Sequence, residues 1–329
     1  MVLVTGATGA IGPRVVQALH EAGFSIHTFS RNPPPMDMLP ADVETHVGDV
    51  TDQSIVQAAM QGIDVVIHLA ALLHVVNPPL ALQERYEQIN VGGTANVVQA
   101  AIASGVRRVV LFSTIAVYGY STGQVLTEDS PSQPDTLYGI TKLAAERIVL
   151  GARRTDGQPL GTVLRVGAIY GARVKGNYAQ LVRALARKRF IPVGAGQNRR
   201  SLIYERDAAQ AAVLAATHPA AAGRVYNITD GKYHTLNEIN AAMCEALSRK
   251  PPRCALPVRP VRLAAGILED GLRVLGRKSP IGRATVDKFI EDVAVDGSRI
   301  QRELGFVPRY DLRAGWRETI REMRQRHLL

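Results

Sequence analysis

VLVTGATGAIG, residues 2–12, decides the fold of this chain. Val2-Leu3-Val4 predicts a buried strand, and a helical pattern follows from about residue 11 to 22 and ends at Gly23. The glycines between strand and helix let the backbone approach a pyrophosphate. The helix N-terminus directs free N–H groups and a positive dipole end at the phosphates. The stretch therefore predicts a dinucleotide-binding turn. Its G-x-x-G-x-x-G spacing is one residue wider at the first gap than the usual motif.

The rest of the chain alternates short apolar runs with helical patterns. We expect further strands at 25–29, 44–47, 64–69, 109–112, 162–166, 201–204 and 225–228, and helices at 52–61, 87–104, 137–150, 176–189, 206–217, 236–249 and 313–326. This order predicts an α/β fold: a doubly wound, Rossmann-type parallel sheet with a smaller, mixed α/β C-terminal domain. Residues 1–170 are expected to bind the dinucleotide, with 201–230 returning to that domain. Residues 171–329 are expected mainly to bind the substrate.

Composition excludes several classes of protein. The 329 residues are 46% hydrophobic and 21% charged, as in an ordinary globular enzyme. Two cysteines exclude a disulfide scaffold, and no apolar run is long enough to span a membrane. We expect no signal peptide and a cytoplasmic location. Aromatic residues are only 5%, too few for a base-stacking surface, so nucleic acid is not expected as a partner.

Charge is divided unevenly along the chain. Residues 1–150 hold 7 basic and 13 acidic residues, whereas residues 151–329 hold 32 basic and 16 acidic residues. The basic half predicts an anionic ligand, such as a phosphorylated substrate or a lipid surface, unless the arginines only cover solvated helices. The segment 261–275 is amphipathic with interspersed arginines. It predicts either a membrane-surface helix or, as we prefer, the cover of a substrate pocket or an ordinary domain helix.

The end of the second strand bears on the choice of cofactor. A carboxylate there favours NAD, and a cation favours the 2′-phosphate of NADP. Ser30 stands where an NAD enzyme usually carries Asp, and Arg31 follows, so we expect NADP, with NAD as the alternative. Asp49 fits a loop that contacts the adenine. No His, Asp or Glu cluster has the spacing of a metal motif, so no metal is expected.

A phenol and an ammonium group stand four residues apart in Tyr138-Gly-Ile-Thr-Lys142. On a helix the two side chains share one face, and the ammonium is expected to lower the tyrosine pKa from about 10 toward neutrality. Tyr138 would then exchange a proton with a carbinol or carbonyl oxygen. Ser113 and Thr114 end an apolar strand, where a hydroxyl would reach the same oxygen.

The ordered set of motifs resembles the extended short-chain dehydrogenase/reductase family, the NAD(P)-dependent epimerase/dehydratase group. The resemblance is carried by TGATGAIG at the start, HLAA at 68–71, NVGGT at 90–94, STIAVYG at 113–119, YGITK at 138–142, LRVGAIYG at 164–171 and the C-terminal ELGFVP. It covers nearly the whole chain. It implies a homodimer that pairs the helices near 87–104 and 138–150.

The resemblance also implies roles for individual residues. Tyr138 would be the general acid/base, Lys142 would bind the nicotinamide ribose, and Thr114 would hold the reacting oxygen. The residues expected to contact the cofactor are Gly6, Thr8, Gly9, Ala10, Ile11, Gly12, Ser30, Arg31, Asp49, Val50, Leu69, Ala70, Ala71, Asn90, Tyr138, Lys142 and Val166. Those expected to contact the substrate are His74, Thr114, Asn177 and Arg200.

Departures from the family pattern bear on which reaction and which substrate are expected. Sugar-nucleotide 4,6-dehydratases carry Thr-Asp-Glu where this chain has Thr114-Ile115-Ala116, so dehydration has no proton carriers. Ala168 replaces an asparagine that often touches a nucleotide sugar, whereas Arg200 matches an arginine that contacts the diphosphate. We therefore expect hydride transfer at C4 of a nucleotide sugar, by a 4-ketoreductase or a 4-epimerase. The alternatives are a hydroxysteroid- or isoprenoid-like alcohol dehydrogenase at a membrane, and a non-catalytic NADP sensor.

Overall fold

The computed structural model describes residues 1–73, 75, 80–121, 123–174, 176–252, 254–275, 277, 279 and 282–329. Seven parallel strands form the central sheet in the order β11-β7-β5-β4-β1-β2-β3. Their bounds are β1 Val2–Thr5, β2 Ile26–Ser30, β3 Glu44–Val47, β4 Val65–His68, β5 Arg108–Thr114, β7 Gly161–Val166 and β11 Val225–Ile228. The expected Rossmann-type fold is confirmed. The order reverses between β1 and β4, and such a switch point opens a crevice at the carboxyl edge of the sheet.

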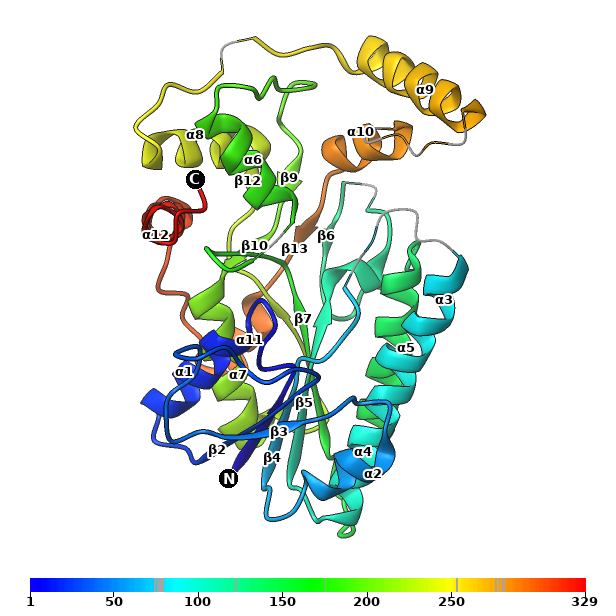
Figure 1. Ribbon diagram of the computed structural model, residues 1–329, viewed down its shortest axis with the longest axis vertical. Coiled ribbons are helices and arrows are strands. Elements are labelled where there is room, and N and C mark those ends of the chain that lie inside the picture. Colours follow the sequence, from blue (N-terminus) through cyan, green and yellow to red (C-terminus); the bar gives the residue numbers. More distant parts are fainter. Residues whose placement is uncertain are drawn as a thin grey trace.

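Helices cover both faces of this sheet (Figure 1). On one side α1 (Gly12–Glu21), α7 (Glu205–Thr217) and α11 (Ser298–Leu304) bury valine, leucine and alanine side chains against the strands. On the other side α2 (Gln53–Ala58), α4 (Gly93–Ala103) and α5 (Leu137–Gly151) form a second apolar layer. Because both faces are buried, the central strands β1, β4, β5 and β7 are largely apolar.

The smaller C-terminal part stands beyond the carboxyl edge of the sheet (Figure 1). Its core packs α6 (Asn177–Ala186), α8 (Leu236–Ala246) and α12 (Leu312–Gln325) around Trp316. Three two-stranded sheets join it to the rest: β8 (Ala168–Tyr170) with β10 (Leu202–Tyr204), β9 (Arg199–Arg200) with β12 (His234–Thr235), and β6 (Val125–Leu126) with β13 (Ala294–Val295). Among the described residues, α9 (Val258–Val274) and α10 (Arg283–Ile290) pack on each other at the end farthest from the sheet.

Helix 87–104 of the sequence prediction is more complex in the structure. The predicted range comprises a π-helical turn η1 (Glu87–Gly92) and α4, and a further helix α3 (Leu80–Tyr86) that was not predicted precedes it. A π-helical turn adds a residue to the helix and is frequent at functional sites. Apolar periodicity does not reveal it, because the residues before and after the turn still bury one face.

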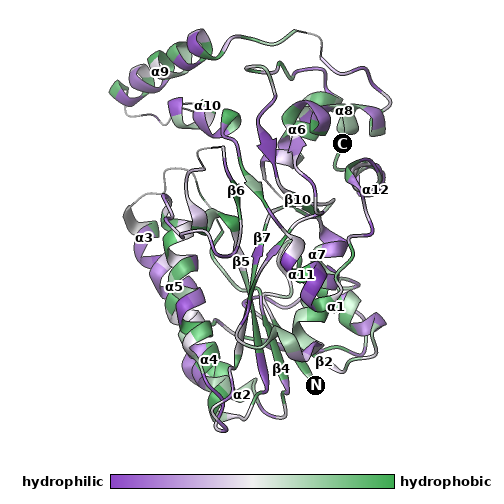
Figure 2. Cartoon of the chain, turned by 180° about the vertical axis from the view of Figure 1, so that it is seen from behind, coloured by the Kyte–Doolittle hydropathy of each residue, from purple (hydrophilic) through white to green (hydrophobic). Residues whose placement is uncertain are grey.

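Hydropathy follows this layering. Figure 2 shows green segments concentrated in the sheet and the inner faces of its helices, while α9 alternates green and purple at the periphery. No helix among the described residues is both long and apolar enough to cross a bilayer.

Candidate active site

A cavity of about 400 Å³ lies at the carboxyl edge of the sheet, where the strand order reverses. It begins at the glycine turn after β1 and ends at Tyr138 and Thr114. Of the residues expected to contact the cofactor, those that line it are Gly6, Thr8, Gly9, Ala10, Ile11, Ser30, Arg31, Asp49, Val50, Leu69, Ala70, Ala71, Tyr138 and Val166. Gly12, Asn90 and Lys142 lie behind this lining.

The glycine turn has no room for a side chain at Gly6 or Gly12, and a bare backbone is what the close approach of a dinucleotide pyrophosphate requires. Gly6 has φ +71°, and a Cβ there would come within 2.7 Å of the Ala70 backbone nitrogen. A Cβ on Gly12 would lie 2.2 Å from the carbonyl oxygen of Ala7, so only glycine lets α1 start this close to the turn. No acidic residue stands in the first turn of α1 to compete with a phosphate for its positive end. The turn and the cavity therefore fit a dinucleotide.

Asn90 positions the cavity wall from behind. Its side-chain oxygen accepts from the Leu72 backbone N–H at 2.7 Å, and its amide donates to the Leu72 carbonyl at 3.2 Å and to the Thr141 hydroxyl at 3.1 Å. The residue lies in the π-helical turn, which explains why a helical position can reach the loop after β4. Asn90 is thus a positioning residue rather than part of the lining.

Thr114 and Tyr138 both line the end of the cavity, and the Thr114 side chain is close enough to lower the pKa of Tyr138. Thr114 ends β5, and its Oγ1 also accepts from the Ala116 N–H at 3.1 Å. Gly139 makes this approach possible, because a Cβ there would lie 2.7 Å from the Ala116 carbonyl oxygen. The neighbouring Ser113 also lines the cavity, but its hydroxyl donates to the buried Glu146 carboxylate.

The expected lowering of the Tyr138 pKa is wrong for this structure. Burial and, secondarily, the nearby Tyr86 raise the pKa of Tyr138 to about 12, although the Thr114 side chain partly opposes them. Burial lowers the pKa of Lys142 to about 8, and Glu146 opposes that effect. The four-residue spacing correctly places both groups on one face of α5, but spacing carries no information about depth. With this pKa Tyr138 is a protonated phenol at neutral pH.

Glu146 and Arg165 form a buried ion pair beneath the site, which the sequence analysis missed. Arg165 Nη2 lies 2.8 Å from Glu146 Oε2, and both side chains are at most 8% exposed. Arg165 also covers the ring of Tyr118, with its guanidinium carbon 4.8 Å from the ring centroid. The available signal was the periodicity of α5, since Tyr138, Lys142 and Glu146 follow one another at four-residue intervals.

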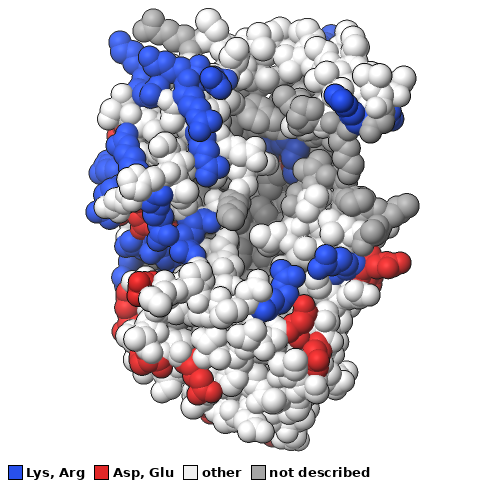
Figure 3. Space-filling view, viewed as in Figure 1, with Lys and Arg blue, Asp and Glu red and all other residues white. Residues whose placement is uncertain are grey.

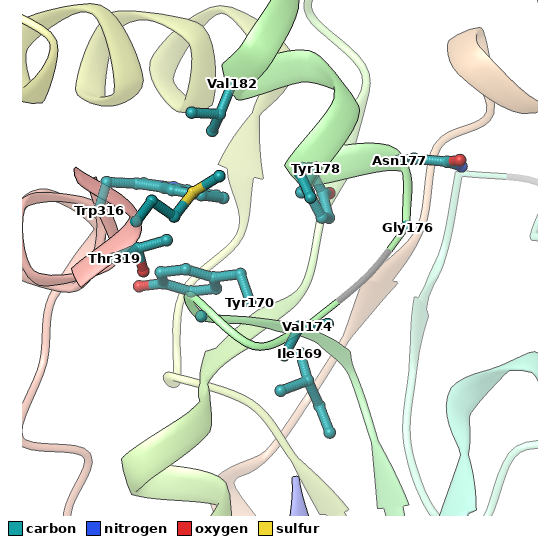
Figure 4. Close-up of a pocket in the computed structure, with 12 residues that line it drawn as sticks. Ile169, Tyr170, Val174, Gly176, Asn177, Tyr178, Val182, Trp316 and Thr319 are labelled. Carbon is teal, nitrogen blue, oxygen red and sulfur yellow. The ribbon is translucent and has the colours of Figure 1, made fainter. Parts of the chain in front are cut away.

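A second, smaller cavity of about 70 Å³ adjoins the first, and Ile169 and Val174 line both. Figure 4 shows its wall of Tyr170, Trp316 and Thr319, with the Tyr170 and Trp316 rings stacked at 4.4 Å between centroids. Asn177, an expected substrate contact, lines this cavity but is largely exposed, and its amide points away from the other labelled side chains.

Arg200, another expected substrate contact, lies elsewhere. The Arg200 guanidinium donates to the Lys288 and Phe289 carbonyls at 2.7 and 3.2 Å, and it is not among the described residues that line either cavity. His74 lies outside the described residues. Thr114 therefore remains the expected substrate contact that the structure places directly at the cavity.

A group of possible metal ligands was overlooked because it spans two strands. His27 on β2 and Glu44 and His46 on β3 bring their ligand atoms within 4.8 Å of one another. His46 Nε2 lies 3.3 Å from His27 Nδ1 and 3.4 Å from a Glu44 oxygen. Spacing along the chain does not show this group, because parallel pairing brings together residues that are far apart in sequence. None of the three lines the described cavities.

Comparison with known proteins identifies the class. A protein-family model, the NAD dependent epimerase/dehydratase family, matches residues 2–229, and this chain belongs to that family. N-acetyl-alpha-D-glucosaminyl-diphospho-ditrans,octacis-undecaprenol 4-epimerase of Escherichia coli O157:H7 is 30% identical over 321 residues, which cover 97% of this chain and 94% of the relative. The 3 beta-hydroxysteroid dehydrogenase/Delta 5-->4-isomerase of Mycobacterium tuberculosis is 29% identical over 325 residues, 93% of this chain and 86% of the relative. The solved structure of MoeE5 in complex with UDP-glucose and NAD is 30% identical, with a TM-score of 0.78. That match covers 100% of this chain and 99% of MoeE5.

Proposed function

We propose that this protein transfers hydride reversibly at C4 of a diphosphate-linked sugar, as a 4-ketoreductase or a 4-epimerase. One observation carries the proposal: the Thr114–Tyr138 hydroxyl pair stands at the end of a cavity shaped for a dinucleotide. The similarity to MoeE5 with UDP-glucose and NAD, and to a 4-epimerase of a diphospho-sugar, supports this substrate class.

The residues that line the cavity would bind the cofactor, orient the sugar and transfer the proton. The glycine turn would hold the pyrophosphate of the cofactor, and Leu69, Ala70 and Val166 would hold its nicotinamide half. When bound, NAD(P) supplies the hydride. Thr114 orients the sugar oxygen, and Tyr138 donates its phenolic proton to that oxygen as the carbonyl is reduced. In the oxidation direction Tyr138 would accept the proton of the sugar hydroxyl, so it must first be deprotonated.

Tyr138→Phe tests the reaction. We expect turnover to fall about 10²- to 10⁴-fold, because one general acid is lost, while cofactor affinity stays near that of the wild type. Tyr120→Phe is the matched control, since Tyr120 is 72% exposed and outside the cavity lining. Thermal shifts with UDP-, dTDP- and GDP-sugars first identify a substrate. Unchanged turnover of Tyr138→Phe on that substrate would remove Tyr138 from the mechanism and support a sensor.

We also propose NADP as the cofactor, with NAD as the alternative. Arg31 and Asp49 are the charged side chains among the described residues that line the cavity, and Arg31 follows the strand end where a 2′-phosphate would lie. We expect Arg31→Ala to weaken NADPH binding at least tenfold, about the size of one charge-assisted contact, and to leave NADH binding unchanged. Purified protein that retains NAD, found by mass spectrometry, would instead indicate a 4-epimerase.

A second substrate class is a hydrophobic alcohol, and exposed apolar side chains on α9 favour it. The similarity to a hydroxysteroid dehydrogenase is consistent with this class. Stabilisation by sterols or prenyl alcohols, with no response to any nucleotide sugar, would favour it over the first. Pairing of two copies through η1–α4 and α5 remains a prediction that light scattering tests.

A further inference from the structure

Helix α9 carries a continuous apolar stripe that faces away from the protein. Its members recur at intervals of three and four residues, so they share one side of the helix. The stripe consists of Pro260, Leu263, Ala264, Ile267, Leu268, Gly271, Val274 and Leu275, every one of them exposed. The five large side chains are between 45% and 87% exposed. Contiguous apolar surface of this kind marks an interaction site more often than solvated structure.

The opposite side of α9 accounts for its packing within the protein. Arg262 pairs with Asp287 of α10 at 2.7 Å, and Asp270 pairs with Arg283 at 2.6 Å. A Cβ on Gly266 would lie 2.5 Å from the Arg283 guanidinium, which shows how closely the two helices approach. The polar side of α9 is therefore fixed to α10. No described residue covers the apolar side, which differs from the preferred sequence expectation of a pocket cover.

Charge around the stripe identifies what it contacts. Residues 249–278 include eight Lys or Arg and only two acidic residues. Arg259 and Arg277, near the two ends of α9, are exposed and have no carboxylate partner within the described part of the chain. Figure 3 shows a largely uncharged surface over α9 and a dense group of Lys and Arg at the same end of the molecule, over α6, α8 and α12.

We propose that α9 docks this protein on the surface of an anionic lipid bilayer. An apolar stripe flanked by cations matches the acyl–headgroup boundary, in which such helices lie flat. A second copy is the poorer occupant, because a two-fold contact through α9 brings the same basic segment of both chains together. Helix α9 stands beyond the carboxyl edge of the sheet, at the end where the catalytic cavity lies. Docking thus turns the cavity end of the protein toward the membrane.

Co-sedimentation with vesicles tests the proposal without any turnover, so its failure is distinct from failure of the proposed reaction. The probes are phosphatidylcholine vesicles with and without phosphatidylglycerol, at low and high salt. We expect binding only with phosphatidylglycerol, weakened by salt. Ile267→Asp and Leu263→Asp should each abolish it, and Arg259→Gln and Arg277→Gln should each weaken it about fivefold.

Matched controls separate the stripe from general surface effects. Val307→Asp changes an apolar side chain that is 74% exposed outside α9, and Arg107→Gln removes an exposed cation at the amino edge of the sheet. Both should bind vesicles like the wild type, and melting curves should show every variant folded. Equal binding by Ile267→Asp, or no binding by the wild type, overturns the proposal. So does a dimer in light scattering that Ile267→Asp dissociates, with no vesicle binding, because it assigns the stripe to a second copy.

Discussion

Acid should destabilise this protein through His68, a buried imidazole at the end of β4. Its Nδ1 accepts from the Thr5 hydroxyl at 2.6 Å, and its Nε2–H donates to Thr94 Oγ1 at 3.1 Å. This tautomer follows from the Thr94 hydroxyl, which itself donates to the Asn90 carbonyl at 2.6 Å. Both ring nitrogens are thus satisfied by the neutral form. Burial, and secondarily the charge of Lys142, lowers the pKa of His68 from 6.5 to about 3.

The sign and size of the effect follow from linkage. Between pH 6.5 and 3 the imidazole of residue 68 is protonated in the unfolded chain but neutral in the folded protein. The unfolded state therefore binds more protons, and the free energy of unfolding falls as pH falls. The loss is about 2 kcal/mol at pH 5 and about 5 kcal/mol once pH drops below 3. Lys142 stays charged in both states over this range and does not contribute.

Urea unfolding from pH 8 to pH 4, for wild type and His68→Asn, measures this contribution. An asparagine oxygen still accepts from Thr5, so the variant should fold at pH 8, less stable by about 1 kcal/mol for the lost bond to Thr94. Its stability should then fall less steeply with acid, and the two curves should cross near pH 6, where the loss at His68 reaches about 1 kcal/mol. His327→Asn, at an exposed position with φ +53° that asparagine tolerates, is the control and should parallel the wild type. Parallel curves for His68→Asn and wild type would refute the assignment of a neutral His68.

Two further substitutions test the packing around the site. Gly12→Ala should destabilise the protein by about 1–3 kcal/mol and weaken dinucleotide binding, because its methyl group would clash with the Ala7 carbonyl. Gly151→Ala is its control, since nothing lies within 4 Å of a Cβ at the end of α5; equal effects in calorimetry would contradict the argument. Glu146→Gln should cost about 3–5 kcal/mol in urea unfolding, because Arg165 is left buried without its counter-charge. Glu318→Gln, in a pair with Arg321 whose side chains are 25% and 58% exposed, should cost less than about 1 kcal/mol, and similar losses in the two variants would show that the buried pair is not special.

The sequence predicts the sheet and the cofactor turn well because both depend on local patterns. Apolar runs locate β1, β4 and β5, and a glycine turn between β1 and α1 has few alternative uses. What sequence reasoning missed depends on contacts between distant residues. The short strands β6, β9, β12 and β13 have only two residues each, too few to show any periodicity. Arg165 and Glu146 stand 19 residues apart, and only the packing of α5 on β7 brings them together. The amphipathic segment at 261–275 was recognised, but whether its apolar side is covered depends on the placement of α10.

One face of α5 links these observations, because it holds three titratable side chains at four-residue intervals, the first at the cavity and the other two in the protein interior. Tyr138 reaches the cavity, Lys142 is 2% exposed, and Glu146 is 1% exposed. Glu146 lies between two cations, Lys142 and Arg165, so its single negative charge stabilises both in a medium of low polarity. Lys142 nevertheless has a pKa of only about 8, which shows that burial outweighs this compensation. Any added negative charge near Lys142 would favour its protonated form, and any added positive charge near Tyr138 would favour phenolate. A ligand that fills the cavity would therefore shift the pKa of either group, and the buried Glu146–Arg165 pair belongs to the surroundings that set the pKa of Lys142 before a ligand binds.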